Sequence, residues 1–545
     1  MRFQLLLYTI LLGSLWGNLY AQNLVNEEDS LVLTVDYPQH RQDDLAIYEI
    51  DRNEILGDST QIVHTAVRRY DIAQDRKIKP RRGWLGAFYK DPDHLYSIRT
   101  NDFSFGFNVY FDLRLGRDLS EDRNIFLNKR GVELFGTLDE KLYFYSAYEE
   151  NQANFLSYRE ALVDDYAAIR GKGNYKPYTS SIIDGAEGYD FGFATAYLGY
   201  KLSKHASLEI GHNRHFIGNG IRSLLLSDET NNYFNVKLEA KFWKIHYQSI
   251  FAELSSISAR FNRGNELLPK KYMVNHYLSI KPFKNIEVGI FEAIVFSREN
   301  QFELQYLNPV IFYRTLEHQL DSPDNVLLGA NGKWNLYNSF SLYGQFILDE
   351  FRFDQFFSGD NWWGNKFALQ LGLKYINVLG INRLDAQIEY NRVRPFTYSH
   401  WKGLEGFEDL TVSNYSHFNQ PLAHPLGANF TEFIFQLRYQ PTERIIASAR
   451  YLRATQGRTA TTGNMGEDLL LNNGTRTSDF NQAQNQGVAT DINLLRVRVA
   501  YEISNRLFID LEILLRDETS TASQLSSSFI GTGLRYNIGK DTVDF

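Results

Sequence analysis

Short segments with a two-residue hydrophobic period recur along most of this chain, and they restrict its fold more than any other feature. Side chains alternate between the two faces of a β-strand, so such a segment has one apolar and one polar face. The clearest segment, 507–517, has Leu507, Ile509, Leu511, Ile513 and Leu515 on one face and Asp510, Glu512 and Arg516 on the other. We expect this segment to be a strand between an apolar and a polar environment.

The length and number of these segments favour a large membrane barrel. Most are about 9–11 residues long or slightly longer, which is the length that a tilted strand needs to cross a bilayer. About 18 of them are expected, near 103–115, 131–138, 142–150, 189–201, 206–213, 232–241, 244–254, 271–280, 286–297, 325–335, 339–349, 366–376, 382–392, 429–439, 444–454, 491–502, 507–517 and 527–538.

The connections between these segments alternate strictly between short and long. The short turns include 139–141, 203–205, 337–339 and 504–506, and the long connections include 151–188, 298–324, 393–428 and 455–490. Short periplasmic turns opposite long outer loops are typical of outer-membrane barrels, whereas a soluble sandwich has no reason to collect its long loops at one end. The sequence therefore predicts an all-β fold, a transmembrane antiparallel β-barrel of about 18 strands over residues 101–545.

Composition agrees with this fold class. Aromatic residues make up 15% of the chain and are spread along almost all of it, while the mean hydropathy of -0.37 is that of a water-soluble protein. The chain has no Cys, which excludes disulfides and thiolate metal sites. The net charge of -8 gives no large basic field, so we expect no nucleic-acid partner.

The N-terminal residues are predicted to form a signal peptide followed by a separate region. Arg2 precedes a short apolar run, Leu5 to Trp16, and Ala21 provides a small residue for cleavage, so residues 1–21 are predicted to be a signal peptide. Residues 22–100 have poor periodicity and are expected to form a small periplasmic region, with the even strand count leaving both termini in the periplasm. The sequence after the signal has no run of about 18 apolar residues, so no helical membrane span is expected.

Two loops expected on the same side of the membrane, 349–365 and 392–428, carry the side chains most suited to a ligand. Aromatic faces stack on sugar rings, and Arg, His and Asn supply directional hydrogen bonds, so this composition suits a glycan. The candidate glycan contacts are Trp362, Trp363, Arg392, Arg394, Tyr398, His400, Trp401, His417, Asn419 and His424. The alternative is a self-packed loop that caps the barrel, with the same aromatic residues buried.

The sequence offers little support for metal or catalytic chemistry. The three loop histidines, His400, His417 and His424, have no spacing that fixes a coordination geometry, so we expect no metal and no cofactor. Ser399 lies near His and Asn residues, but no Gly-x-Ser-x-Gly elbow occurs. We therefore expect the protein not to be an enzyme.

Three loop segments carry a family resemblance: Phe216 to Asp228, Asn308 to Asn325, and Arg394 to Asn429. Together they resemble the capsule-assembly Wzi-like superfamily, and more closely its branch in gliding bacteria, the gliding motility protein RemB. The resemblance implies an 18-stranded barrel with a small periplasmic helical part and loops folded over the lumen. It also implies a surface lectin that holds capsular polysaccharide or, in the gliding branch, a mobile surface protein linked to motility.

Three functions follow as hypotheses. The first is an outer-membrane protein that binds or anchors surface polysaccharide in capsule or exopolysaccharide assembly, with a role in gliding motility. The second is a surface component associated with motility or type 9 secretion that contacts protein partners. The third is a diffusion porin. All three place the chain in the cell outer membrane, in contact with its lipid, with extracellular loops.

Overall fold

The computed structural model describes residues 52, 54–57 and 94–544, except 140, 181–184, 257–268, 299–302, 310–311, 316–323, 351, 401–412, 461–462, 505 and 538–543. The predicted signal peptide, 1–21, lies outside the described residues, as does most of the predicted periplasmic region, 22–100.

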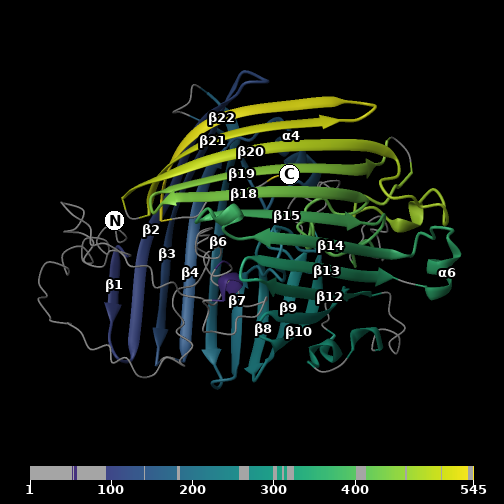
Figure 1. The fold of residues 1–545 in the computed structure, drawn as a ribbon, viewed down its shortest axis with the longest axis horizontal. Coiled ribbons are helices and arrows are strands. Elements are labelled where there is room, and N and C mark those ends of the chain that lie inside the picture. The colour runs from purple at the N-terminus through teal and green to yellow at the C-terminus, as the bar shows by residue number, and fades with distance from the viewer. Residues whose placement is uncertain are drawn as a thin grey trace, which may run out of the picture. The chain divides into compact units, whose positions relative to one another are not determined.

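Eighteen antiparallel strands form a closed barrel, shown in Figure 1. In order around the barrel they are β2 (Phe103–Asp118), β3 (Arg123–Leu138), β4 (Leu142–Ala153), β6 (Glu187–Lys201), β7 (Ala206–Asn213), β8 (Tyr233–Phe242), β9 (Ile245–Ser255), β10 (Lys270–Phe283), β11 (Ile286–Phe296), β12 (Asn325–Leu336), β13 (Phe340–Glu350), β14 (Lys366–Tyr375), β15 (Leu384–Val393), β18 (Phe430–Thr442), β19 (Ile445–Arg458), β20 (Val488–Ser504), β21 (Leu507–Thr519) and β22 (Gln524–Tyr536). Pairing of β22 with β2, from Phe111 opposite Tyr536 to Asp118 opposite Phe529, closes the sheet.

Short strands and helices lie in the connections between the barrel strands and next to the barrel wall. β1 (Tyr96–Arg99) pairs with the first part of β2, β5 (Lys176–Thr179) pairs with the start of β6, and β16 (Ser416–His417) pairs with β17 (Gln420–Pro421). Helices with both ends among the described residues include α4 (Ser157–Tyr166), α6 (Phe353–Ser358), and the 3-10 turns η2 (Leu304–Leu307), η3 (Val378–Gly380) and η4 (Asn473–Thr475). Within the described part of the chain, none of the helices combines the length and apolar character needed to cross a membrane.

Each of the eighteen predicted segments corresponds to a barrel strand, and the predicted register is confirmed. Ile509, Leu511 and Leu515 are 47%, 47% and 44% exposed on the outer wall, whereas Asp510 between them is 1% exposed. Leucine and isoleucine side chains on the outside of a closed sheet are stable only against hydrocarbon. The outer wall is therefore the lipid-facing surface, and the charged face lines the interior.

The strict alternation of short and long connections is wrong at two places. β3 begins at Arg123, eight residues before the predicted start at 131, so the connection from β2 consists of residues 119–122 alone. In the first half of β3, Asn124 and Arg130 project outward. These polar side chains interrupt the two-residue hydrophobic period, so the pattern did not show where the strand begins. The β21–β22 connection, 520–523, is equally short. The other connections at this end are long, and we call it the long-loop end; the opposite end is the short-turn end.

Part of the N-terminal region enters the barrel at the short-turn end. Residues 52 and 54–56 are helical, and the Glu54 carboxylate lies 2.9 Å from Lys281 Nζ and 3.1 Å from Lys333 Nζ. Arg52 donates to Asn377 Oδ1 at 2.8 Å and lies 3.7 Å from Asp385. Because these partners are inward-facing or turn residues, the helical residues fill part of the lumen there.

Candidate functional site

The connection between β7 and β8, residues 214–232, turns into the lumen instead of projecting from the barrel. Ile217, Leu224, Leu225 and Leu226 are fully buried, in contact with inward-facing wall residues. Gln345 on β13 holds the segment at two points, because its Oε1 accepts from Leu224 N at 2.8 Å and its Nε2 donates to Ile217 O at 3.0 Å. An apolar run in a loop is stable here because it is the core of the filled barrel.

The connection between β15 and β18, residues 394–429, packs on this inserted segment. The rings of Tyr398 and Tyr415 stack with centroids 5.9 Å apart. Their hydroxyls donate to the successive carbonyls of Leu224 and Leu225, both at 2.8 Å. Each of the two Tyr-Ser-His triplets therefore supplies one tyrosine that holds the inserted segment. These two tyrosines agree with the alternative prediction, a self-packed loop that caps the barrel.

Lys271, on β10, also holds this loop from the wall. Its Nζ donates to Asn414 O at 2.9 Å, Asn414 Oδ1 at 2.7 Å and Ser416 Oγ at 3.0 Å. Asn419 reaches the connection between β4 and β6, where its Nδ2 donates to Tyr166 O at 3.3 Å. Together these contacts fix the loop to two separate elements, β10 and the β4–β6 connection.

His417 is buried as a neutral side chain. Its Nδ1 accepts from Ser255 N at 3.0 Å, so its Nε2 carries the proton and donates to Asn232 O at 3.1 Å. Burial lowers the pKa of His417 to about 3. The histidine thus joins the ends of two other loops by neutral hydrogen bonds.

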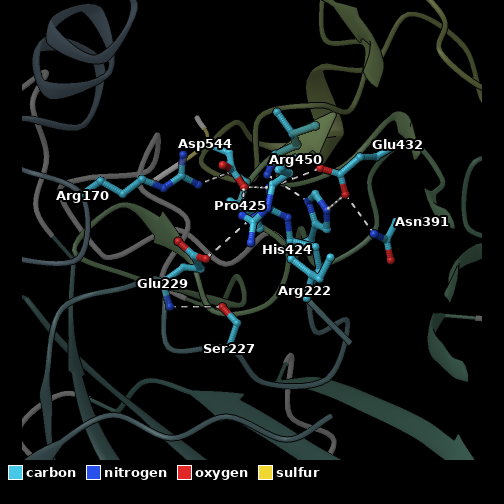
Figure 2. A network of polar contacts seen from close by, with 12 residues as sticks. Arg170, Arg222, Ser227, Glu229, Asn391, His424, Pro425, Glu432, Arg450 and Asp544 are labelled. Atoms are coloured by element: carbon cyan, nitrogen blue, oxygen red, sulfur yellow. Dashed lines mark hydrogen bonds and ion pairs between the residues drawn. The ribbon is translucent and has the colours of Figure 1, made fainter. Parts of the chain in front are cut away.

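A charged network in the interior, shown in Figure 2, joins the inserted segment to the wall and to Asp544. Arg222 donates to Asp544 Oδ2 at 2.8 Å, Arg450 donates to the same oxygen at 2.6 Å, and Arg496 donates to Oδ1 at 2.7 Å. Burial raises the pKa of Asp544, but Arg450, Arg222 and Arg496 outweigh burial and hold the pKa well below its usual range. Three guanidinium groups on separate elements therefore converge on one carboxylate.

His424 extends the network on its other side. Its Nδ1 accepts from Leu426 N at 3.1 Å, and its Nε2 donates to Glu432 Oε2 at 2.7 Å. Asn391 donates to the same carboxylate oxygen at 2.9 Å. Burial lowers the pKa of His424, with Glu432 opposing this shift, which agrees with the neutral tautomer that the hydrogen bonds require.

The two tryptophans lie at the long-loop end and are half-buried. Trp362 and Trp363 have ring centroids 5.9 Å apart. The Arg476 guanidinium lies 3.9 Å from the centroid of Trp363, and that of Arg352 lies 5.5 Å from the centroid of Trp362. Trp363 N also donates to Asp479 O at 2.9 Å, so the connection between β19 and β20, residues 459–487, completes this cluster.

The loops 349–365 and 392–428 are in contact, as predicted. Trp363 packs edge-on against Phe396 with centroids 6.0 Å apart, and Tyr398 N donates to Asp349 Oδ2 at 2.6 Å. His400 lies 3.3 Å from Glu350, whose carboxylate is also 3.2 Å from Lys366 Nζ. The two loops therefore form one continuous structure.

The ten candidate glycan contacts divide into three groups. Trp362, Trp363, Arg392 and His400 are partly exposed at the long-loop end; Arg394, Tyr398, His417, Asn419 and His424 are buried in protein; Trp401 lies outside the described residues. Arg392 donates to Gln484 Oε1 at 3.1 Å, and Arg394 donates to Gln482 O at 3.3 Å.

Sequence reasoning missed two arginines at this site, Arg352 and Arg476. Arg476 and Arg352 carry no motif, and they meet the tryptophans only because three loops converge. Arg222 does lie in one of the segments that carried the family resemblance, but its role depends on Asp544, which is distant in sequence. No local pattern predicts such a contact.

The family model described as capsule assembly protein Wzi matches residues 129–522. The chain belongs to the Wzi capsule-assembly family. The matched range begins within β3 and ends after β21, so it covers most of the barrel together with the inserted segment and the loops of the site. Family and fold place the protein in the outer membrane. The match does not separate the gliding branch from the rest of the Wzi family.

The fold is similar to that of a solved Wzi structure. Wzi of Escherichia coli, described as a carbohydrate-binding β-barrel involved in group 1 capsule assembly, is 12% identical with a TM-score of 0.52 and covers 92% of this chain and 99% of its own. OprD and OpdK of Pseudomonas aeruginosa are each 9% identical, with TM-scores of 0.42 and 0.43. Each covers 79% of this chain, and 94% and 97% of its own length, respectively. No curated protein sequence matches the chain.

Proposed function

We propose that this protein binds surface polysaccharide at the long-loop end of the barrel and serves capsule or exopolysaccharide assembly. One observation carries the proposal at the level of residues. The half-buried Trp362 and Trp363 present aromatic rings beside Arg352 and Arg476 on a loop surface of a Wzi-family barrel. Aromatic faces stack on sugar rings, and the planar guanidinium fork matches the carboxylate of an acidic sugar.

The proposed site is narrower than the sequence suggested. Tyr398 and His417 use their polar atoms to hold the inserted segment, and His424 bonds to Leu426 and Glu432, so all three support the site from below. The ligand contacts that we propose are Trp362, Trp363, Arg352, Arg392, His400 and Arg476. E. coli Wzi is described as carbohydrate-binding, which supports the class of ligand. Four of the six side chains are cationic or basic, and two of them, Arg352 and Arg476, also pair with Asp354 and Asp479 at 3.1 and 2.5 Å, so an acidic polysaccharide must compete with these carboxylates.

The test replaces Trp362 and Arg352 with Ala together. Arg352 is largely exposed, so the double variant should still insert and show heat-modifiable migration. We expect its binding to purified capsular polysaccharide to fall at least tenfold, because stacking and an ionic contact are lost together. Trp243→Ala is the matched control, since Trp243 is 77% exposed on a turn at the opposite end. Unchanged binding in an inserted double variant would refute this location.

The role in gliding enters only through the resemblance of the loop segments to that branch. We propose it as a use of the same polysaccharide contact, with motility or secretion proteins as partners. Deletion of the gene, scored for polysaccharide retention and surface spreading, separates the two roles. Loss of spreading with normal retention would favour a protein-contacting motility component over polysaccharide binding.

A further inference from the structure

One part of the connection between β11 and β12 lies on the outside of the barrel. Side chains that face outward on these strands are identified by exposure: Leu278 on β10 is 40% exposed, Ile290 on β11 is 52% exposed, and Leu328 on β12 is 39% exposed. Val274, Ile294 and Val326 have the same parity on the same strands, yet they are 1%, 0% and 3% exposed. Another part of the protein therefore covers the outer wall there.

The covering segment consists of residues 303–309 and 312–315, which we call the outer strap. Tyr306 and Tyr313 of the strap are fully buried in one cluster with the covered wall residues. Tyr306 lies with its ring centroid 4.8 Å from that of Phe296, and its hydroxyl donates to Asp324 Oδ2 at 2.7 Å. On the far side, Tyr247 of β9 donates to Pro309 O at 2.7 Å. The strap thus crosses the outer wall from β12 to β9.

The wall beneath the strap is polar where a barrel in lipid should be apolar. His276 on β10 and Glu292 on β11 are direct cross-strand partners near the middle of their strands, and both face outward. The strap satisfies them: the Tyr313 hydroxyl is hydrogen-bonded to His276 Nε2, and Arg314 N donates to Glu292 Oε1 at 3.2 Å. Without the strap, a carboxylate and an imidazole would face hydrocarbon, which is costly near the bilayer midplane.

The outer face of the strap carries exposed apolar side chains, together with the exposed polar residues Gln305, Asn308 and Arg314. Leu304, Leu307 and Phe312 project away from the barrel and are 70%, 50% and 66% exposed. On the wall beside them, Val288 and Ile290 are 48% and 52% exposed and belong to the lipid-facing surface. The three strap side chains therefore continue an existing lipid-facing surface across the polar gap.

We infer that the outer strap is a lipid-contacting element, in which Leu304, Leu307 and Phe312 contact the acyl chains of the outer membrane while its inner side screens His276 and Glu292 from them. Irregular backbone at membrane depth is tolerated where its polar groups are satisfied by protein. Several polar backbone groups of the strap are satisfied by the wall contacts and by its own turns, in which Tyr306 N donates to Glu303 O and Thr315 N donates to Phe312 O. The inference is independent of polysaccharide binding.

The first test uses the absence of cysteine from the chain. Leu304→Cys and Phe312→Cys are each spin-labelled, reconstituted in phosphatidylcholine bilayers, and compared for collision with oxygen and with a water-soluble nickel chelate. Ile290→Cys is the control in lipid, and Ser478→Cys, on an exposed loop, is the control in water. We expect both strap labels to match the label at 290, with access to oxygen well above access to the chelate.

Two results would overturn the inference. Strap labels that match the label at 478 would place the strap in water. Strap labels protected from both reagents would show that protein, such as a second copy of this chain, covers the strap instead of lipid. Either result leaves polysaccharide binding untouched.

The second test addresses the screening role. Replacing residues 303–315 with a short Gly-Ser linker should remove most of the heat-modifiable folded protein, because His276 and Glu292 then face acyl chains. Adding His276→Leu and Glu292→Leu to that variant should restore most of the folded band. If the two leucines give no recovery, the strap does not act by screening these residues.

Discussion

At the scale of single residues, His417 shows how the interior uses neutral hydrogen bonds where a charge would be expelled. Protonation would turn its Nδ1 from an acceptor into a donor that faces the N–H of Ser255. Burial holds its pKa at about 3, and burial also lowers the pKa of His215 to about 4. These histidines should therefore make the stability of the barrel depend on pH in one direction.

The predicted sign follows from proton binding. An unfolded histidine has a pKa of about 6.5, so between pH 6.5 and about 3 the unfolded chain binds a proton at His417 that the folded chain does not. The unfolding free energy should be highest above pH 6.5 and fall as the pH is lowered, by up to about 1.4 kcal/mol per pH unit for each such histidine. His417→Gln keeps one donor and one acceptor without titrating. The unfolding free energy of this variant should therefore change less steeply with pH, by the contribution of one histidine.

Urea unfolding of the detergent-solubilised protein from pH 7 to pH 4 measures this slope. His205→Gln, on an exposed turn, is the control and should leave it unchanged. Equal slopes for His417→Gln and the natural chain would show that His417 is not held neutral in the folded state.

At the scale of elements, the strands could be predicted from sequence and the inserted loops could not. The period of two is a local consequence of lying between lipid and a polar interior, so all eighteen strands left a visible pattern. The start of β3 was missed because two outward-facing residues in its first half, Asn124 and Arg130, are polar. Tyr398 and Tyr415 show the limit for loops, since the same aromatic and polar composition suits a sugar-binding surface and a buried clamp. Only their contacts with Leu224 and Leu225 distinguish the two.

The strand register makes a prediction of its own. Leu511→Arg places a charge against hydrocarbon near the middle of β21 and should cost about 2–4 kcal/mol of unfolding free energy. Glu512→Gln, one residue later, faces the interior and should cost about 1 kcal/mol or less, because Arg496 keeps Asp544 as a partner at 2.7 Å. Unfolding of both variants in phospholipid bilayers tests the register, and equal costs would show that the assignment of faces is wrong.

At the scale of the whole molecule, the interior is filled from several distant parts of the chain. The 214–232 and 394–429 connections supply the central packing. Leu156, just before α4, and Tyr158 of α4 pack beside β18 to β21, and residues 52 and 54–56 fill the short-turn end. Asp544 joins this interior to Arg222, Arg450 and Arg496. None of these contacts leaves a local signal, because each joins residues that are far apart in the sequence. The sequence pattern therefore predicts the barrel wall but not the segments that fill its interior.

The filled interior predicts that this barrel conducts poorly, although a closed sheet of about 18 strands is wide enough for an aqueous channel. Reconstituted in planar bilayers, the natural chain should show little or no conductance. Replacing residues 217–228 with a short Gly-Ser linker removes Arg222 and the leucines that Tyr398 and Tyr415 hold, so stepwise channel openings should appear. Shortening α6, which Figure 1 shows beyond the ends of β13 and β14, should leave the barrel closed and serves as the control. Porin-sized conductance in the natural chain would instead mean that the inserted segment leaves the lumen in a membrane, and would favour a diffusion porin over a polysaccharide-binding surface protein.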